Sequence, residues 1–336
     1  MKNVSKLALF VAAGMVSAGV NAADFEVGEN TTVSIFGEME VQMSEVTDSN
    51  GNAELDFSDE GSLFGFGGEQ DFGNGISAYV VGEFEYDILD ESDGFDQGDG
   101  EFGIKGPFGE VAIGDVGSVA IDATWDRVDV FESTAIAEPD GSSSSSSIAY
   151  FSPEMNGLEV FLQTRISDDS DNDAEDDGDT NNVTETRDTG SDISLIAGLL
   201  YTVGPVTFGA GYDDRGSELL DAPSTQQKDP TYGVSASANF SDRMTVTVNF
   251  NTEQDASASA NDTDYTALSA VYNYGAGDIY GAVQDVSPET GDSRTEVQIG
   301  ADYTIMGELN AYAEYAALDK TNDAGDLMEV GLRFEF

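Results

Sequence analysis

The sequence predicts an all-β protein that folds as a transmembrane antiparallel β-barrel of sixteen strands. Three observations predict this fold class. Apolar and polar residues alternate in segments of about ten residues, such as 244–251, which is the length of a tilted strand that crosses a bilayer. Short turns and long acidic loops connect these segments in alternation. Tyrosine and phenylalanine recur near the segment ends, where membrane barrels carry aromatic girdles.

The first element of the chain is a leader. Lys2 and Lys6 precede an apolar stretch at 7–20, and small residues follow at 20–22. This is the anatomy of a secretory signal peptide, so we expect cleavage after Ala22 and one barrel domain at 23–336. A membrane anchor is the alternative, but the apolar stretch is shorter than the ~20 residues of a spanning helix.

Sixteen segments with the period of a β-strand follow the leader. In the first of them Val33 and Ile35 alternate with Ser34 and Phe36, and the last ends at the terminal aromatic residue Phe336. The predicted strands are 31–43, 62–72, 76–88, 100–106, 110–116, 147–152, 157–167, 191–203, 205–214, 231–240, 244–253, 264–274, 278–286, 294–304, 308–317 and 327–336.

The connections fall into two classes. The short ones contain turn-forming residues, such as Gly, Asn, Pro and Asp, as in 72–75 and 241–243. The long ones are polar and acidic, and they comprise 44–61, 89–99, 117–146, 168–190, 215–230, 254–263, 287–293 and 318–326. Short turns at one end and long loops at the other are typical of an outer-membrane barrel. A secreted β-sandwich would show the same alternation and is the alternative fold.

The composition excludes several functions. After residue 22 there remain ten basic and 66 acidic side chains, a net charge of −56, which repels nucleic acid. Cysteine and histidine are both absent, which excludes disulfides, thiolate zinc sites and histidine-dependent catalysis. We therefore expect no enzyme and no cofactor, although a hydrolase built only on Asp and Glu stays an alternative. Weakly bound Ca²⁺ or Mg²⁺ at acidic loops such as 168–179 is a further possibility.

Three stretches resemble the Gram-negative general diffusion porins. Residues 62–75 (SLFGFGGEQDFGNG) are similar to their second strand and turn. Residues 102–114 (FGIKGPFGEVAIG) also resemble these porins, and residues 148–158 (IAYFSPEMNGL) are similar to the strand that follows their long third loop. The resemblance covers the whole mature chain, and Phe336 matches the residue that the family presents to the outer-membrane insertion machinery.

This resemblance implies a water-filled homotrimeric barrel in the outer membrane of a Gram-negative bacterium, in contact with lipopolysaccharide. It also implies that the third loop, here 116–147, folds into the pore and narrows it. The function would be passive diffusion of small hydrophilic solutes and ions. A substrate-specific porin and a non-conducting structural or adhesin barrel are the alternatives.

The candidate pore residues are mostly acidic. The third loop contributes Asp122, Asp126, Asp129 and Glu132 to the expected constriction. Strand periodicity places seven further side chains on the inner wall: Glu38, Glu40, Glu83, Glu85, Glu101, Lys105 and Arg165. The family often has an arginine where Asp115 stands and a lysine where Gly67 stands, so the usual basic side of the pore is depleted. Because rings of carboxylates favour cations, we expect a cation-preferring channel.

Overall fold

The computed structural model describes residues 22–89, 94–134, 136–139, 146–168, 191–215, 230–254 and 262–336. The predicted signal peptide and the acidic stretch at 168–179 lie outside these ranges, except for Ala22 and Asp168. Within them, no helix has both the length and the apolar character that crossing a bilayer requires.

The described chain forms strands and two short helices. The strands are β1 (Ala23–Gly28), β2 (Thr31–Thr47), β3 (Ala53–Asp59), β4 (Leu63–Gly73), β5 (Ile76–Glu85), β6 (Asp96–Gly106), β7 (Gly109–Gly114), β8 (Ser147–Phe151), β9 (Leu158–Asp168), β10 (Ser191–Val203), β11 (Val206–Asp213), β12 (Thr231–Ser241), β13 (Met244–Glu253), β14 (Thr263–Asn273), β15 (Asp278–Pro288), β16 (Arg294–Met306), β17 (Leu309–Ala317) and β18 (Leu327–Glu335). The helices are α2 (Val119–Thr124) and the 3₁₀ turn η2 (Thr321–Asp323).

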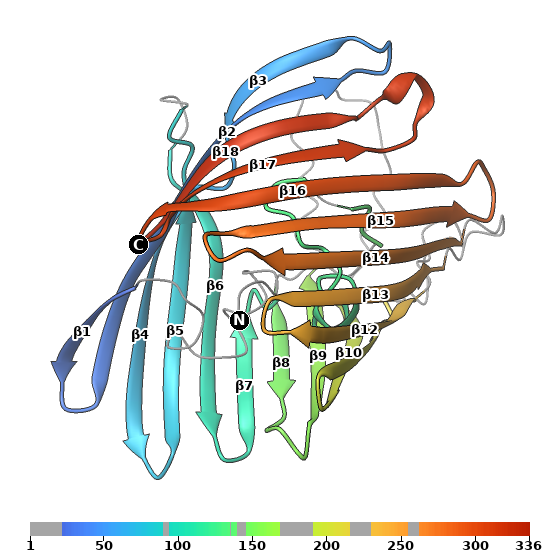
Figure 1. Ribbon diagram of the computed structural model, residues 1–336. Coiled ribbons are helices and arrows are strands. Elements are labelled where there is room, and N and C mark those ends of the chain that lie inside the picture. Colours follow the sequence, from blue (N-terminus) through green and yellow to red (C-terminus); the bar gives the residue numbers. More distant parts are fainter. Residues whose placement is uncertain are drawn as a thin grey trace, which may run out of the picture.

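Sixteen of these strands form a closed antiparallel barrel (Figure 1). Strands β4 to β18 pair in chain order, and the ring closes because β2 pairs with both β4 and β18. A closed ring leaves no open sheet edge, which is the condition for a β-structure in hydrocarbon. The sixteen segments predicted from the alternation are confirmed as these strands.

Two further strands extend the ring along β2, and the sequence reading missed both. β3 pairs with residues 41–47 of β2, so the prediction of a loop over all of 44–61 is wrong for Ala53–Asp59. This strand is exposed along most of its length and carries Glu54, Asp56 and Asp59, which gave it the composition of an acidic loop. β1 is only six residues long and directly follows the predicted leader.

The start of β1 and the C-terminal residue both lie beside β2. The backbone of Phe336 exchanges two hydrogen bonds with Gly37 (2.9 and 3.0 Å), and Ala23 pairs with Ile35. β1 pairs with residues 31–35 of β2 and β18 pairs with residues 38–46. Because β4 and β3 occupy the other edge of β2 over the same two stretches, β1 and β18 lie end to end along one edge. β1 thus continues the line of the last strand of the ring.

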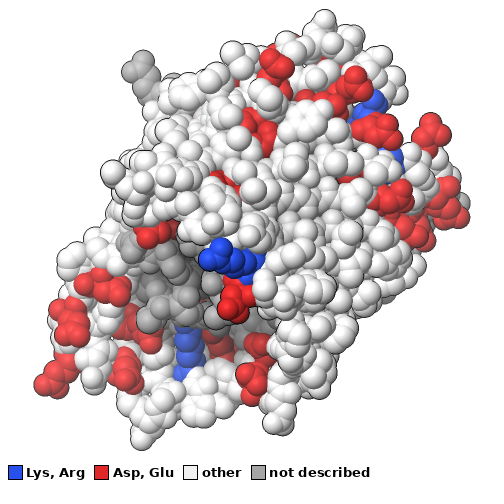
Figure 2. Space-filling model, viewed as in Figure 1, with Lys and Arg blue, Asp and Glu red and all other residues white. Residues whose placement is uncertain are grey.

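Each ring strand separates its side chains into an exposed apolar face and a buried polar face. On β13, Val248 and Phe250 are exposed, whereas Thr247, Asn249 and Asn251 are buried. In a closed ring the buried face is the inner face, so the interior is polar and the exterior apolar. Figure 2 shows acidic side chains toward the right-hand and lower-left margins, with a broad surface of few charges between them.

Candidate functional site

The third loop lies against the inner face of the barrel. We call its described part, residues 116–134 and 136–139, the inner segment. The backbone N–H of Val119 donates to Oε1 of Gln163 on β9 (3.1 Å). Three strands further round, Oγ of Ser235 on β12 donates to the carbonyl oxygen of Ala123 (2.8 Å). Helix α2 is therefore fastened to the wall at both of its ends.

Glu314 of β17 holds the turn at residues 132–134 of the inner segment. This side chain is 3% exposed. It accepts hydrogen bonds from the backbone N–H groups of Glu132 (2.8 Å), Ser133 (3.3 Å) and Thr134 (2.9 Å). The hydroxyls of Thr134 (2.9 Å) and Tyr280 (2.7 Å) donate to it as well. One carboxylate thus satisfies three successive backbone donors that would otherwise be buried without a partner.

The C-terminal part of the inner segment, residues 136–139, is held by β15 and β16. The N–H of Ala137 donates to Oε2 of Glu296 (3.0 Å). The carbonyl oxygen of Ala137 accepts from Nε2 of Gln284 (2.9 Å) and from Nε1 of Trp125 (3.0 Å). The tryptophan therefore joins the two halves of the inner segment to each other.

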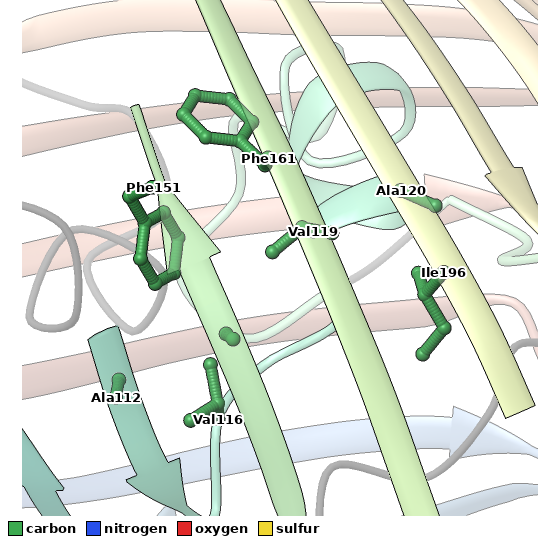
Figure 3. Close-up of a cluster of buried hydrophobic side chains, with 8 residues drawn as sticks. Ala112, Val116, Val119, Ala120, Phe151, Phe161 and Ile196 are labelled. Carbon is green, nitrogen blue, oxygen red and sulfur yellow. The ribbon is translucent and has the colours of Figure 1, made fainter. Parts of the chain in front are cut away.

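Apolar contacts add to these polar ones. Two clusters of buried side chains lie between the inner segment and the wall, and Figure 3 shows the first. The first contains Ala112, Val116, Val119, Ala120, Ala149, Phe151, Phe161 and Ile196, and the second contains Ile121, Trp125, Val128, Ile136, Ala267 and Ala282. Burial of this surface, together with the hydrogen bonds, keeps the inner segment inside the barrel.

Two of the predicted constriction carboxylates form a pair. Asp122 lies in α2 and Asp126 lies two residues beyond its end, and their carboxyl groups are joined by a hydrogen bond. Burial, the neighbouring charge of Asp126 and a hydrogen bond to it raise the pKa of Asp122 well above its usual range. Asp122 therefore keeps its proton to higher pH than a solvent-exposed aspartate does.

Asp129 titrates near physiological pH. The pKa of Asp129 is raised from 3.8 to about 8, mainly by burial and also by the charges of Asp126, Glu314 and Glu138, while a hydrogen bond from the N–H of Phe131 opposes the rise. The unfolded chain releases this proton at lower pH than the folded chain. The contribution of Asp129 to stability therefore falls as pH rises from about 4 to about 8.

This titration predicts a pH-dependent selectivity. If Asp129 borders the ion path, cation preference is expected to fall as pH drops from about 9 to about 7, because the carboxylate becomes neutral. Reversal potentials across a salt gradient, measured at intervals of pH, would show the step. Asp129→Asn should remove it, and a wild-type profile that stays flat until pH ~5, where ordinary carboxylates titrate, would contradict the assignment.

Glu132, the fourth predicted constriction residue, is engaged in an ion pair. Its carboxylate contacts the guanidinium of Arg333 on β18, with one hydrogen bond from Nη2 of 3.1 Å. Two other arginines are also ion-paired, Arg215 with Glu253 (3.1 Å) and Arg294 with Glu296 (2.7 Å). These bases therefore offer little uncompensated positive charge to the interior.

The predicted wall residues lie on the polar faces of their strands. Glu40 and Glu101 are buried, Glu85 is exposed at the end of β5, and the remaining four are partly buried. The full set is Glu38 and Glu40 on β2, Glu83 and Glu85 on β5, Glu101 and Lys105 on β6, and Arg165 on β9.

Lys105 lies among acidic groups. Its Nζ is 4.2 Å from the centroid of the Tyr79 ring, and it is directly opposite Glu110 in the β6–β7 ladder. The hydroxyl of Tyr79 is in hydrogen-bond contact with the carboxylates of both Glu101 and Glu110. Lys105 therefore does not create a basic patch on this wall.

The sequence reading did not single out the residues that anchor the inner segment. Glu296, Glu314 and Glu329 lie on the polar faces of β16, β17 and β18, and Glu314 is directly opposite Glu329. Strand periodicity could have placed them on the inner face. No local sequence pattern could have shown that Glu314 accepts a hydrogen bond from Thr134, which lies 180 residues earlier in the chain.

Acidic loops are the expected places for weakly bound Ca²⁺ or Mg²⁺. In the part of the chain that the structure describes, no group of three or more Asp or Glu side chains is arranged to hold a metal ion. The stretch at 168–179 lies outside that part, except for Asp168.

Comparison with known proteins agrees with this geometry. The family model described as Gram-negative porin matches residues 8–323. A monosaccharide porin from Halomonas sp and the major outer membrane protein of Halomonas elongata are each 27% identical over 374 residues, covering 98% of this chain and 99% of the relative. A solved structure of a mutant Rh. blastica porin covers 90% of this chain and 100% of its own, with a TM-score of 0.67 and 19% identity.

Proposed function

The chain belongs to the Gram-negative porin family and is therefore an outer-membrane channel rather than an enzyme, and we propose that it passes small hydrophilic solutes and prefers cations. The observation that supports this proposal most is the inner segment, whose carboxylates Asp122, Asp126 and Asp129 lie inside a barrel with a polar inner face. The inner segment would form the narrowest part of the water path.

Cation preference follows from the carboxylates on both sides of the water path. The wall from β2 to β7 contributes Glu38, Glu83, Glu101 and Glu110, and its one lysine is compensated by neighbouring carboxylates. The inner segment adds its own carboxylates opposite that wall. With negative groups on both sides, anions are repelled and cations exchange part of their hydration for carboxylate contacts.

Reversal potential in a salt gradient tests the preference. We expect a potassium permeability several-fold above that of chloride, because the fixed charges are negative. At a pH of about 9, where Asp129 is ionised, the double variant Asp126→Asn and Asp129→Asn should lower this ratio about twofold or more, whereas Asp242→Asn, at an exposed turn, should leave it unchanged. A channel that prefers chloride would contradict the proposal.

Neutral solutes would use a different part of the wall. Toward the short turns, the described inward positions of β10 to β14 carry no carboxylate. Beside the apolar Leu200 and Val271 they present hydroxyls and amides, which include Thr202, Thr207, Ser237, Asn239, Thr245 and Asn273. Such groups both donate and accept hydrogen bonds, which suits hydroxyl-rich molecules. Since one relative is named a monosaccharide porin, small sugars are the neutral solutes that we propose first.

The assembly that we propose is a homotrimer in a lipopolysaccharide-containing outer membrane. Export would use the leader at 1–22, leaving a mature barrel at 23–336. The barrel-assembly machinery would recognise the C-terminal strand, in which Phe334 and Phe336 stack with their ring centroids 5.8 Å apart.

A further inference from the structure

Helix α2 contacts the barrel wall through its backbone. Three glycines of β10 and β11 lie beneath it: Gly198, Gly209 and Gly211, which we call the glycine seat. A Cβ atom on them would lie 2.2, 1.9 and 2.3 Å from the carbonyl oxygens of Val119, Ala123 and Ala120, respectively. Real Cβ atoms do not approach other atoms so closely. No larger residue fits at these positions unless the helix moves.

The register of the sheet brings the glycine seat together. Gly198 and Gly211 are directly opposite each other in the β10–β11 ladder. Gly209 is opposite Ser235 of β12, whose hydroxyl donates to the carbonyl oxygen of Ala123 (2.8 Å). The helix is therefore held by a hydrogen bond where its backbone comes closest to the wall.

Backbone conformation does not explain these glycines. None of the three has a positive φ, so other residues could adopt their strand conformation. Glycine inside a strand costs about 0.5–1 kcal/mol relative to alanine, and a close backbone approach is one of the features that accompanies it. The close approach of α2 is the contact that requires glycine here.

The helix matches the seat with small residues of its own. Ala120 and Ala123 are buried on the side of the wall, whereas Asp122 and Asp126 are partly exposed. The distance between the helix and the wall therefore fixes how far these two carboxylates project toward the barrel axis.

We propose that the glycine seat determines the width of the channel and so its solute size limit. This inference rests on the proposed channel function. A methyl group on Gly209 must move from 1.9 Å to at least 3.4 Å from the Ala123 oxygen, so the helix shifts inward by about 1.5 Å. The inner segment then narrows the water path from the side of β10 to β12.

The test compares Gly209→Ala and Gly211→Ala with Gly68→Ala in planar bilayers and in liposome swelling with sugars of graded size. Gly68 is a matched control, because a Cβ there meets nothing closer than 3.7 Å. We expect each seat variant to lower single-channel conductance roughly twofold and to exclude the larger sugars, with the control unchanged. Thermal melting measured in parallel separates narrowing from loss of the fold.

Ser235→Ala provides a second test that adds no bulk. It removes the hydroxyl that holds Ala123, so the open-channel current is expected to fluctuate several-fold more than in the wild type. Seat variants that fold and keep wild-type conductance and size limit would overturn the inference while leaving the channel function intact. If the glycine variants do not fold, open-channel current in Ser235→Ala that fluctuates no more than in the wild type would overturn the inference on the glycine seat. A wild-type protein that does not conduct would overturn both this inference and the proposed function.

Discussion

Replacing Glu314 by alanine is expected to release the turn of the inner segment from the wall. The carboxylate is the hydrogen-bond acceptor for Glu132, Ser133 and Thr134, and all three lose their partner together. A hydrogen bond to a charged group contributes about 1.5–3 kcal/mol, so the turn loses roughly 4 kcal/mol or more of attachment. That loss raises the ratio of released to attached turn roughly a thousandfold.

Limited proteolysis and single-channel recording would detect the release. Cleavage at Phe131 should be slow in the wild type and fast in Glu314→Ala, whose conductance should become larger and noisier. Glu314→Gln keeps one acceptor oxygen and should lie in between, and Glu289→Gln, in an exposed loop, serves as the control. A protected Phe131 together with unchanged current in Glu314→Ala would show that the other contacts hold the inner segment without this carboxylate.

Dialysis from molar to millimolar salt is expected to destabilise the protein strongly. The whole chain has a formal net charge of −54, and exposed acidic side chains are direct neighbours in places, such as Glu85 and Asp96 in the β5–β6 ladder. Salt shortens the range of their repulsion from ~30 Å at 0.01 M to ~3 Å at 1 M. The folded state therefore loses stability relative to the expanded chain when salt is removed.

Thermal melting at a series of potassium chloride concentrations measures this effect. We expect the melting temperature to fall by about 10 °C or more between 1 M and 0.01 M salt, since several kcal/mol are involved. Sucrose at matched osmolality should not replace the salt, because it does not screen charge. A melting temperature that is the same at both ends of the series would contradict the inference that salt stabilises this acidic protein by screening its charge.

The barrel was predictable because each ring strand has one face toward an apolar and one toward a polar environment. The alternation on β13 and β18 needs no knowledge of distant residues, and the turn at Asn74 and Gly75 is equally local: both have positive φ, of 59° and 73°, as a two-residue hairpin turn requires. β3 was not predictable in the same way. Ala53, Leu55 and Phe57 do alternate with Glu54, Asp56 and Ser58, but this strand has only seven residues, pairs beyond the end of β4 and lies inside a long acidic connection.

The pore was only partly predictable. Periodicity gave the inward direction of Glu40, Glu101 and Lys105, because direction depends on strand parity alone. It could not give the ion pair of Glu132 with Arg333, nor the anchoring role of Glu314, because both depend on the path of the inner segment through the barrel. The role of Gly209 likewise becomes visible only when α2 is in place.

A planar lipid bilayer tests most directly whether the polar faces of this barrel enclose a water-filled path and its apolar faces meet lipid. Wild-type protein added from detergent is expected to raise the current in discrete, equal steps, with a conductance that increases with bulk salt and a reversal potential of the cation-selective sign. A membrane that stays insulating, with the protein soluble as a compact monomer after detergent removal, would contradict the account.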